Sequence, residues 1–138
     1  MIKIFLSTHG KMASGMKNSL DILLGNTDCL TVFDAYINEE PVEKHLEDFF
    51  TANPENSCIR LLVSDIYGGS VNQVLSRYCN EKNTYVITGI NLALLMSLVL
   101  ASDRDIEKQE LINMIEESKT MTQLVSLDFD VPEQEEFF

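Results

Sequence analysis

Residues 58–78, CIRLLVSDIYGGSVNQVLSRY, join a short apolar run to an apolar stripe through a glycine-containing turn. The run Cys58–Asp65 is predicted to be a buried strand, because it is short, rich in branched aliphatic residues and bounded by turn residues. After the turn, apolar residues recur at steps of three and four from Val71 to Tyr78, which predicts a helix. A strand that turns directly into a helix is the repeating unit of α/β folds.

The same alternation continues on both sides of this unit. The predicted strands cover residues 2–7, 29–35, 58–65 and 84–89, and the predicted helices cover residues 12–24, 38–50, 71–78, 92–101 and 106–118. Strands that alternate with helices indicate a parallel sheet with helices on both faces. We therefore expect a three-layer α/β fold with four parallel strands in the common order 2-1-3-4, in a single domain over residues 1–131.

The end of the chain has a different pattern. Apolar and polar residues alternate from Thr122 to Val131, which predicts a half-buried fifth strand. Because the first four strands are more uniformly apolar, we expect this strand to be antiparallel or to lie at an edge of the sheet. Residues 132–138 form an acidic tail. The all-apolar helix over residues 92–101 needs a cover, either within the monomer or from a second subunit.

Charge and composition exclude several classes of protein. The net charge of −12 opposes binding to nucleic acid or to an anionic membrane surface, and it suits a partner with a positive docking face. The longest apolar run, 92–101, is half the length needed to span a bilayer, and the N-terminus lacks the features of a signal peptide. The three cysteines are widely spaced, which favours neither a disulfide framework nor a zinc site. We expect a cytoplasmic protein without a metal or cofactor.

His9 and Asp65 are the first candidate catalytic residues. Each follows a predicted strand, and in the order 2-1-3-4 these two strands are neighbours at the switch point where α/β folds bind ligands. A neutral imidazole accepts a phosphoryl group when one nitrogen is free and the other is held as a donor. The Asp65 carboxylate is the natural acceptor for the Nδ1–H group. The alternative is a histidine that only hydrogen-bonds its own loop.

The loop Gly68–Gly69–Ser70 is a candidate phosphoryl-binding element. Glycines let backbone N–H groups approach an anion, and the Ser70 hydroxyl could donate to a phosphoryl oxygen or only cap the following helix. Neither a P-loop nor GxGxxG is present, so ATP and NAD binding are not indicated. Thr8 and Asn91 are weaker candidates, since both could serve only loop geometry. His45, among acids on a predicted helix, is interpreted as structural.

Three motifs together resemble a known family. STHG after the first strand, SDIYGGSVNQ after the third and VITGINLALLM around the fourth are similar to the mannose/fructose/sorbose class of enzyme IIA domains. These domains belong to the bacterial phosphoenolpyruvate-dependent sugar phosphotransferase system. The resemblance covers about residues 1–131. Two departures are Val71, where many members carry proline, and the pair Ile66–Tyr67.

The resemblance implies a role for each candidate residue. His9 would take a phosphoryl group from the phosphocarrier HPr and pass it to a IIB component on a separate chain, which is linked to membrane IIC and IID components. Asp65 would match the carboxylate beside that histidine, and Gly68, Gly69 and Ser70 the loop beside the phosphoryl group. The family is homodimeric, and its last strand crosses to the partner's sheet, which matches the pattern of Thr122–Val131.

Two alternatives stay open from the sequence. One is the related subunit that phosphorylates a dihydroxyacetone kinase, although the THGKMASGM start and the DIYGGS loop favour the sugar transport class. The other is a non-enzymatic, flavodoxin-like regulatory module in which His9 only shapes its loop.

Overall fold

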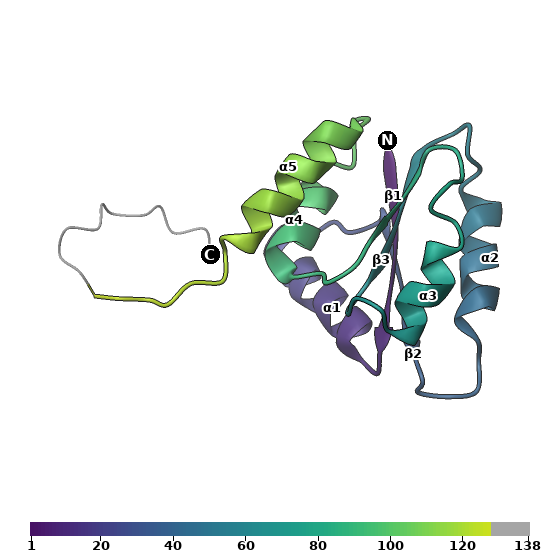
Figure 1. Cartoon of the computed structure of the whole chain (residues 1–138), viewed down its shortest axis with the longest axis horizontal. Helices are drawn as coiled ribbons and strands as arrows, with labels where there is room; N and C mark the ends of the chain where they lie inside the picture. Colours follow the sequence, from purple (N-terminus) through teal and green to yellow (C-terminus); the bar gives the residue numbers. More distant parts are fainter. Residues whose placement is uncertain (128–138) are drawn as a thin grey trace.

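The computed structural model describes residues 1–127, in which four strands alternate with five helices (Figure 1). The elements are β1 (Ile2–His9), α1 (Met12–Leu24), β2 (Leu30–Ala35), α2 (Val42–Ala52), β3 (Ile59–Ser64), α3 (Ser70–Ser76), β4 (Thr84–Ile87), α4 (Leu92–Leu100) and α5 (Lys108–Lys119). Strand β1 extends to His9, two residues beyond the predicted end, because His9 still pairs with Ala35 of β2.

The four strands form one parallel sheet in the order β2-β1-β3-β4, which confirms the predicted order. Strand β1 pairs with β2 on one side and with β3 on the other, where Ser7 lies opposite Ser64. All strands point the same way, so their carboxyl ends meet at one edge, at the bottom of Figure 1. The residues that follow β1, β2 and β3 are thereby placed together.

Helices cover both faces of the sheet, as predicted. Alternate β1 residues point to opposite faces, with Ile4 and Leu6 in one cluster of buried side chains and Phe5 in the other. The first cluster contains buried residues of α1, α4 and α5, and the second contains buried residues of α2 and α3. Figure 1 shows the sheet between these two helical layers. Because both faces are covered, the strands are apolar on both sides rather than alternating.

Helix α4 is largely covered within the monomer. Leu94, Leu95 and Leu98 are buried in the first cluster, and α5 packs against α4. Leu100 remains exposed, at 65%. Helix α5 and the core therefore cover most of α4, and Leu100 is left uncovered within residues 1–127 of one chain.

The predicted C-terminal strand is not confirmed. Residues 122–127 form no strand in the structure, and Leu124, Val125 and Leu127 are almost fully exposed. Residues 128–131 of that prediction lie outside the described residues. A strand needs a hydrogen-bonded neighbour, and within residues 1–127 of a single chain this segment pairs with none of β1–β4.

Candidate active site

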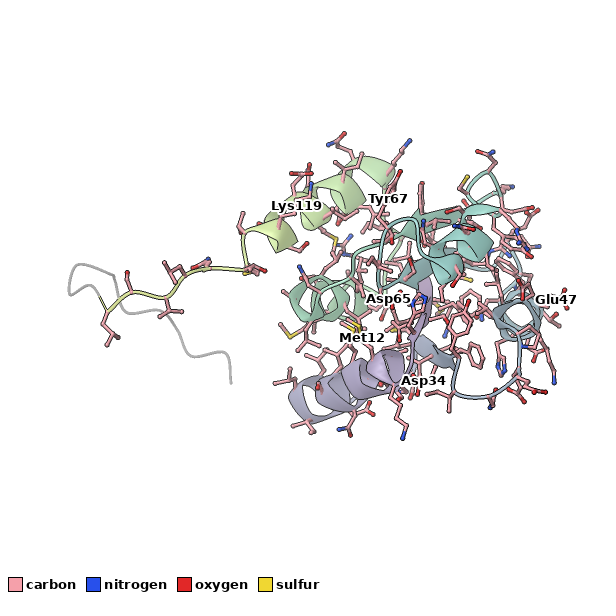
Figure 2. The ribbon with its side chains drawn as sticks, turned by 60° about the horizontal axis from the view of Figure 1, so that its bottom comes forward. Met12, Asp34, Glu47, Asp65, Tyr67 and Lys119 are labelled. Carbon is pink, nitrogen blue, oxygen red and sulfur yellow. The ribbon has the colours of Figure 1, made fainter. Side chains whose placement is uncertain are left out.

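His9 and Asp65 meet at the carboxyl edge of the sheet. His9 is the last residue of β1, and Asp65 directly follows the last residue of β3. The Asp65 Oδ2 atom accepts a hydrogen bond from the His9 backbone N–H at 2.9 Å and lies 2.9 Å from His9 Nδ1. Figure 2 turns this edge toward the reader and labels Asp65, Met12 and Asp34 there. The structure thus brings together two residues that are 56 positions apart in the sequence.

The Asp65 carboxylate has the character of a fixed acceptor. Its second oxygen, Oδ1, accepts the Ile66 backbone N–H at 3.0 Å. Burial opposes its ionisation and is the largest single influence, but the backbone and ring hydrogen bonds from His9, a further backbone hydrogen bond and the electrostatic attraction of His9 together lower the pKa of Asp65. An ionised carboxylate accepts the Nδ1–H proton, so the ring adopts the tautomer in which Nε2 carries the lone pair.

Ser70 lies in front of this lone pair. The Ser70 Oγ atom is 3.3 Å from His9 Nε2. Ser70 is the first residue of α3, Gly69 occupies the N-cap position, and no side chain of residues 1–127 caps this end of the helix. The hydroxyl therefore faces His9 rather than capping α3. This favours a Ser70 that donates a hydrogen bond to a phosphoryl oxygen over a Ser70 that only caps the helix.

The two glycines allow the loop to approach His9. Gly68 has a φ of +75°, a left-handed conformation that L side chains rarely adopt. A Cβ atom at Gly69 would lie 2.7 Å from Ile66 Cγ2 and 3.3 Å from His9 Cε1. A side chain at Gly69 would thus collide with Ile66 and press against the imidazole ring.

Tyr36 is a site residue that the sequence analysis missed. It follows β2, its hydroxyl lies 2.5 Å from Ser70 Oγ, and its ring stacks on the His9 ring with centroids 5.1 Å apart. The sequence motifs lie in the loops after the first, third and fourth predicted strands, and none of them covers the loop after the second. Strand β2 is the other neighbour of β1, so an aromatic residue at its carboxyl end was the signal that could have found Tyr36.

Thr8 and Asn91 make structural contacts away from His9 Nε2. The Thr8 side chain is buried and accepts the Ala13 N–H at 2.7 Å, which holds the start of α1. Asn91 caps α4 by accepting the Leu94 N–H, and its amide donates to the Ser118 carbonyl at the end of α5. Thr8 thus fixes the segment after His9 to α1, and Asn91 fixes the start of α4 to the end of α5.

The second histidine lies in a different environment. The His45 ring stacks on Phe33 with centroids 3.9 Å apart, and His45 Nε2 lies 2.7 Å from Glu40 Oε2. These contacts tie α2 to β2 and to the loop between them, in agreement with a structural role.

The surface next to His9 carries exposed apolar side chains from the segments that directly follow β1, β2 and β3. The large apolar residues that are exposed there are Met12, Tyr36, Ile37, Ile66 and Tyr67. An exposed cluster of this kind marks an interaction surface more often than chance exposure does. A shallow hollow next to it is lined by Tyr36 together with the acidic residues Glu39, Glu40 and Glu43.

The resemblance of the three motifs to enzyme IIA domains is tested by a comparison with protein families. A family model described as "PTS system fructose IIA component", EIIA-man, matches residues 3–116. The chain belongs to this family. The PTS is the phosphoenolpyruvate-dependent sugar phosphotransferase system, so the resemblance drawn from the three motifs is confirmed.

Relatives of this EIIA-man chain include a curated protein and solved structures. The chain is 28% identical over 120 residues to the mannose-specific EIIAB component of Escherichia coli K12, which covers 85% of this chain and 37% of the relative. The chain therefore spans little more than a third of the length of that relative.

Two solved structures share the fold. A candidate sugar phosphotransferase system permease from Klebsiella pneumoniae has a TM-score of 0.79 at 22% identity, covering 89% of this chain and 90% of that protein. The phosphotransferase system component EIIA from Streptococcus agalactiae has a TM-score of 0.73 at 22% identity, covering 91% and 97%. The EIIA-man fold is thus found in solved structures whose sequences differ widely from this one.

Proposed function

We propose that this chain is the IIA subunit of a mannose-class sugar phosphotransferase system, which accepts a phosphoryl group from phospho-HPr on His9 and passes it to a IIB component. The observation that carries the proposal is the geometry of His9. Its Nδ1 atom lies 2.9 Å from the Asp65 carboxylate, and its Nε2 atom is directed to the Ser70 hydroxyl at an exposed strand end. Family membership supplies the reaction class, and this geometry supports His9 as the residue that performs it.

The transfer forms one P–N bond and breaks another. The lone pair on His9 Nε2 attacks the phosphorus atom of the donor phosphohistidine, and the donor's nitrogen recovers the electron pair of the bond that breaks. His9 keeps its Nδ1 proton, so the ring becomes a phosphorylated imidazolium beside the negative Asp65 carboxylate. The second transfer, to IIB, reverses these changes. Asp65 thus orients the ring and stabilises the positive charge that the ring gains.

The phosphoryl group is held weakly in this proposal. It adds close to two negative charges to a chain whose net charge is already −12. The side chain that the structure places in front of Nε2 is a neutral hydroxyl, that of Ser70. Weak neutral stabilisation suits a group that is passed on rather than kept.

Protein partners fit the surface around His9. The exposed apolar side chains next to His9 offer a contact area, and the acidic hollow beside Tyr36 suits a partner with a basic docking face. We take HPr and a IIB component on a separate chain, itself linked to membrane IIC and IID components, as the two partners. The proposal places this subunit in the cytoplasm, and no helix within residues 1–127 is long and apolar enough to cross a bilayer.

The proposal is tested by phosphorylation in vitro. The chain is incubated with phosphoenolpyruvate, enzyme I and HPr, and its intact mass is measured. We expect the mass of one phosphoryl group to be added, to be lost in acid, and to move to a IIB component when that is supplied. No added mass with an HPr that loads a known IIA protein would contradict the proposed function.

We also propose a homodimer in which residues 122–131 pair with the partner's sheet. Strand β4 is an outer strand, and the groove between β4 and α5 is lined by apolar residues that include Tyr85, Ile112 and Ile115. Leu124, Val125 and Leu127 are exposed apolar residues that lack a cover within residues 1–127 of one chain. An outer strand has unpaired backbone N–H and C=O groups along one side, and the alternating segment needs a strand with which to form hydrogen bonds. Pairing the two would satisfy both.

Light scattering after gel filtration tests this assembly. The whole chain is expected to have the mass of a dimer, and the double substitution Val125→Asp with Leu127→Asp is expected to shift it to the monomer. A monomeric wild-type chain would refute the dimer. If the variant with the two aspartates is still a dimer, the proposed dimer stands and the exchanged strand is refuted.

A further inference from the structure

Tyr36 occupies a backbone conformation that its residue type disfavours. Its φ angle is +65°, in the left-handed region, and its side chain is 62% exposed. Burial in the core therefore does not explain why a large aromatic residue stands at this position. Non-glycine residues held in this region are concentrated at functional sites, so the contacts of the side chain deserve a functional explanation.

The Tyr36 ring covers one face of the His9 imidazole. The two ring centroids are 5.1 Å apart and the planes differ by 20°, which is a stacked arrangement. The strained backbone directs the side chain back over the end of β1 instead of out along the loop. One face of the nucleophilic ring is thereby shielded from water, while Nε2 at the ring's edge stays accessible.

The Tyr36 hydroxyl also completes a line of hydrogen bonds that ends at Nε2. Because Asp65 takes the Nδ1–H proton, Nε2 is an acceptor, and the Ser70 hydroxyl donates to it across 3.3 Å. A serine hydroxyl has one proton, so Ser70 Oγ must accept the hydrogen bond that Tyr36 donates across 2.5 Å. The Tyr36 hydroxyl thus donates to the Ser70 hydroxyl, which in turn donates to the atom that the proposed function phosphorylates.

We propose that Tyr36 is a second phosphoryl-binding residue of this site, an inference that rests on the proposed function. When Nε2 carries a phosphoryl group, that group occupies the space in front of Ser70, and the Ser70 and Tyr36 hydroxyls both donate to its oxygens. Tyr36 keeps its proton throughout, and no bond other than the P–N bond changes. The ring meanwhile protects one side of that bond from attack by water.

The charge of the phosphoryl group makes a second donor valuable. Asp65 lies on the opposite side of the imidazole and repels the added negative charge, whereas hydroxyl donors make charge-assisted hydrogen bonds to it. Such a hydrogen bond to a charged group is worth about a tenfold change in an equilibrium constant, or somewhat more. Removing the Tyr36 hydroxyl should therefore change the stability of the phosphorylated state measurably without affecting the core.

The test uses two matched tyrosine variants. Tyr36→Phe removes only the hydroxyl, and Tyr78→Phe makes the same change in a tyrosine that packs against Phe50 of α2, with ring centroids 4.9 Å apart, outside the surface next to His9. Each protein is loaded through enzyme I and HPr, and its phosphohistidine is followed by phosphorus NMR. We expect Tyr36→Phe to shift the phosphohistidine resonance and to lower occupancy at equilibrium with HPr about tenfold, while Tyr78→Phe behaves as the wild type. Tyr36→Ala should in addition lose the phosphoryl group to water several-fold faster than Tyr36→Phe.

The outcomes separate this inference from the proposed function. If the wild type loads but Tyr36→Phe keeps the wild-type resonance and equilibrium, Tyr36 does not bind the phosphoryl group and the proposed function stands. If the wild type does not load at all, both are refuted. Equal thermal unfolding curves for the variants and the wild type establish that any difference arises at the site.

Discussion

Replacing His9 with glutamine is expected to abolish phosphoryl loading, with a fall of roughly a thousandfold or more in the rate of transfer from phospho-HPr. The glutamine amide can still donate a hydrogen bond to Asp65, so the strand end keeps a partner for the partly buried carboxylate. An amide nitrogen has no available lone pair, however, and cannot form the P–N bond. Intact mass after incubation with phosphoenolpyruvate, enzyme I and HPr measures the effect directly.

The other histidine of the chain provides the control. His45→Gln makes the same chemical change at a ring that stacks on Phe33 and bonds to Glu40, away from Asp65 and Ser70. We expect this variant to load fully and the His9→Gln variant to stay at its unmodified mass. Loading of the His9 variant, or loss of loading in the His45 variant alone, would assign the phosphoryl group to a different residue from the one proposed.

The sequence predicts the relation between His9 and Asp65 because two simple rules determine it. Alternating strands and helices indicate a parallel sheet, and parallel strands deliver the residues that follow them to one edge. The order of strands then makes β1 and β3 neighbours, so residues 56 positions apart come within hydrogen-bonding distance. Neither rule requires knowledge of side-chain packing.

Tyr36 and Ser70 show where such rules end. A positive φ at Tyr36 is unexpected for a tyrosine, because residue type predicts the opposite, and only the three-dimensional structure shows the ring turned over His9. The role of Ser70 depends on whether its hydroxyl faces its own helix or His9. A serine at the start of a helix favours capping, whereas the observed hydroxyl faces Nε2.

The last predicted strand could not be judged from one chain for a different reason. The alternating pattern of residues 122–131 indicates which side chains would be buried in a strand, but it does not identify the strand with which they would pair. If that neighbour belongs to a second copy, a single chain leaves residues 122–127 exposed, which is the arrangement observed.

Replacing Asp65 with asparagine is expected to slow phosphoryl transfer to His9 by about 10²–10⁴-fold while the fold persists. The asparagine is nearly the same size and can accept the Nδ1–H proton through its carbonyl oxygen. It has no negative charge to stabilise the phosphorylated imidazolium, and its amide group can instead donate to the ring and favour the wrong tautomer. Rapid mixing with phospho-HPr, followed by acid-free quenching and mass measurement, gives the rate.

The same aspartate-to-asparagine change on the neighbouring strand β2, Asp34→Asn, is the control for the loss of a carboxylate in general. Asp34 is the last residue but one of β2 and accepts hydrogen bonds from the backbone N–H and the hydroxyl of Ser14, at 2.9 and 2.5 Å, so Asp34→Asn alters the start of α1 without touching His9. We expect Asp34→Asn to transfer at close to the wild-type rate. Wild-type transfer in Asp65→Asn, or equal slowing in both variants, would remove Asp65 from the mechanism.

The substitution Asp65→Asn is also expected to change how the stability of the fold depends on pH. Burial tends to raise the pKa of Asp65, but the hydrogen bonds to its carboxylate and the electrostatic attraction of His9 together hold it below its ordinary value of about 3.9. A carboxyl whose pKa is lower in the folded than in the unfolded state stabilises the fold above its unfolded pKa, and that stabilisation is lost as the pH falls through the folded value. Asparagine lacks this contribution at every pH. In urea denaturation, wild type should therefore be more stable than Asp65→Asn at pH 7, and the difference should shrink below about pH 3.9; a difference that is constant over this range would mean that the ionised carboxylate does not supply it.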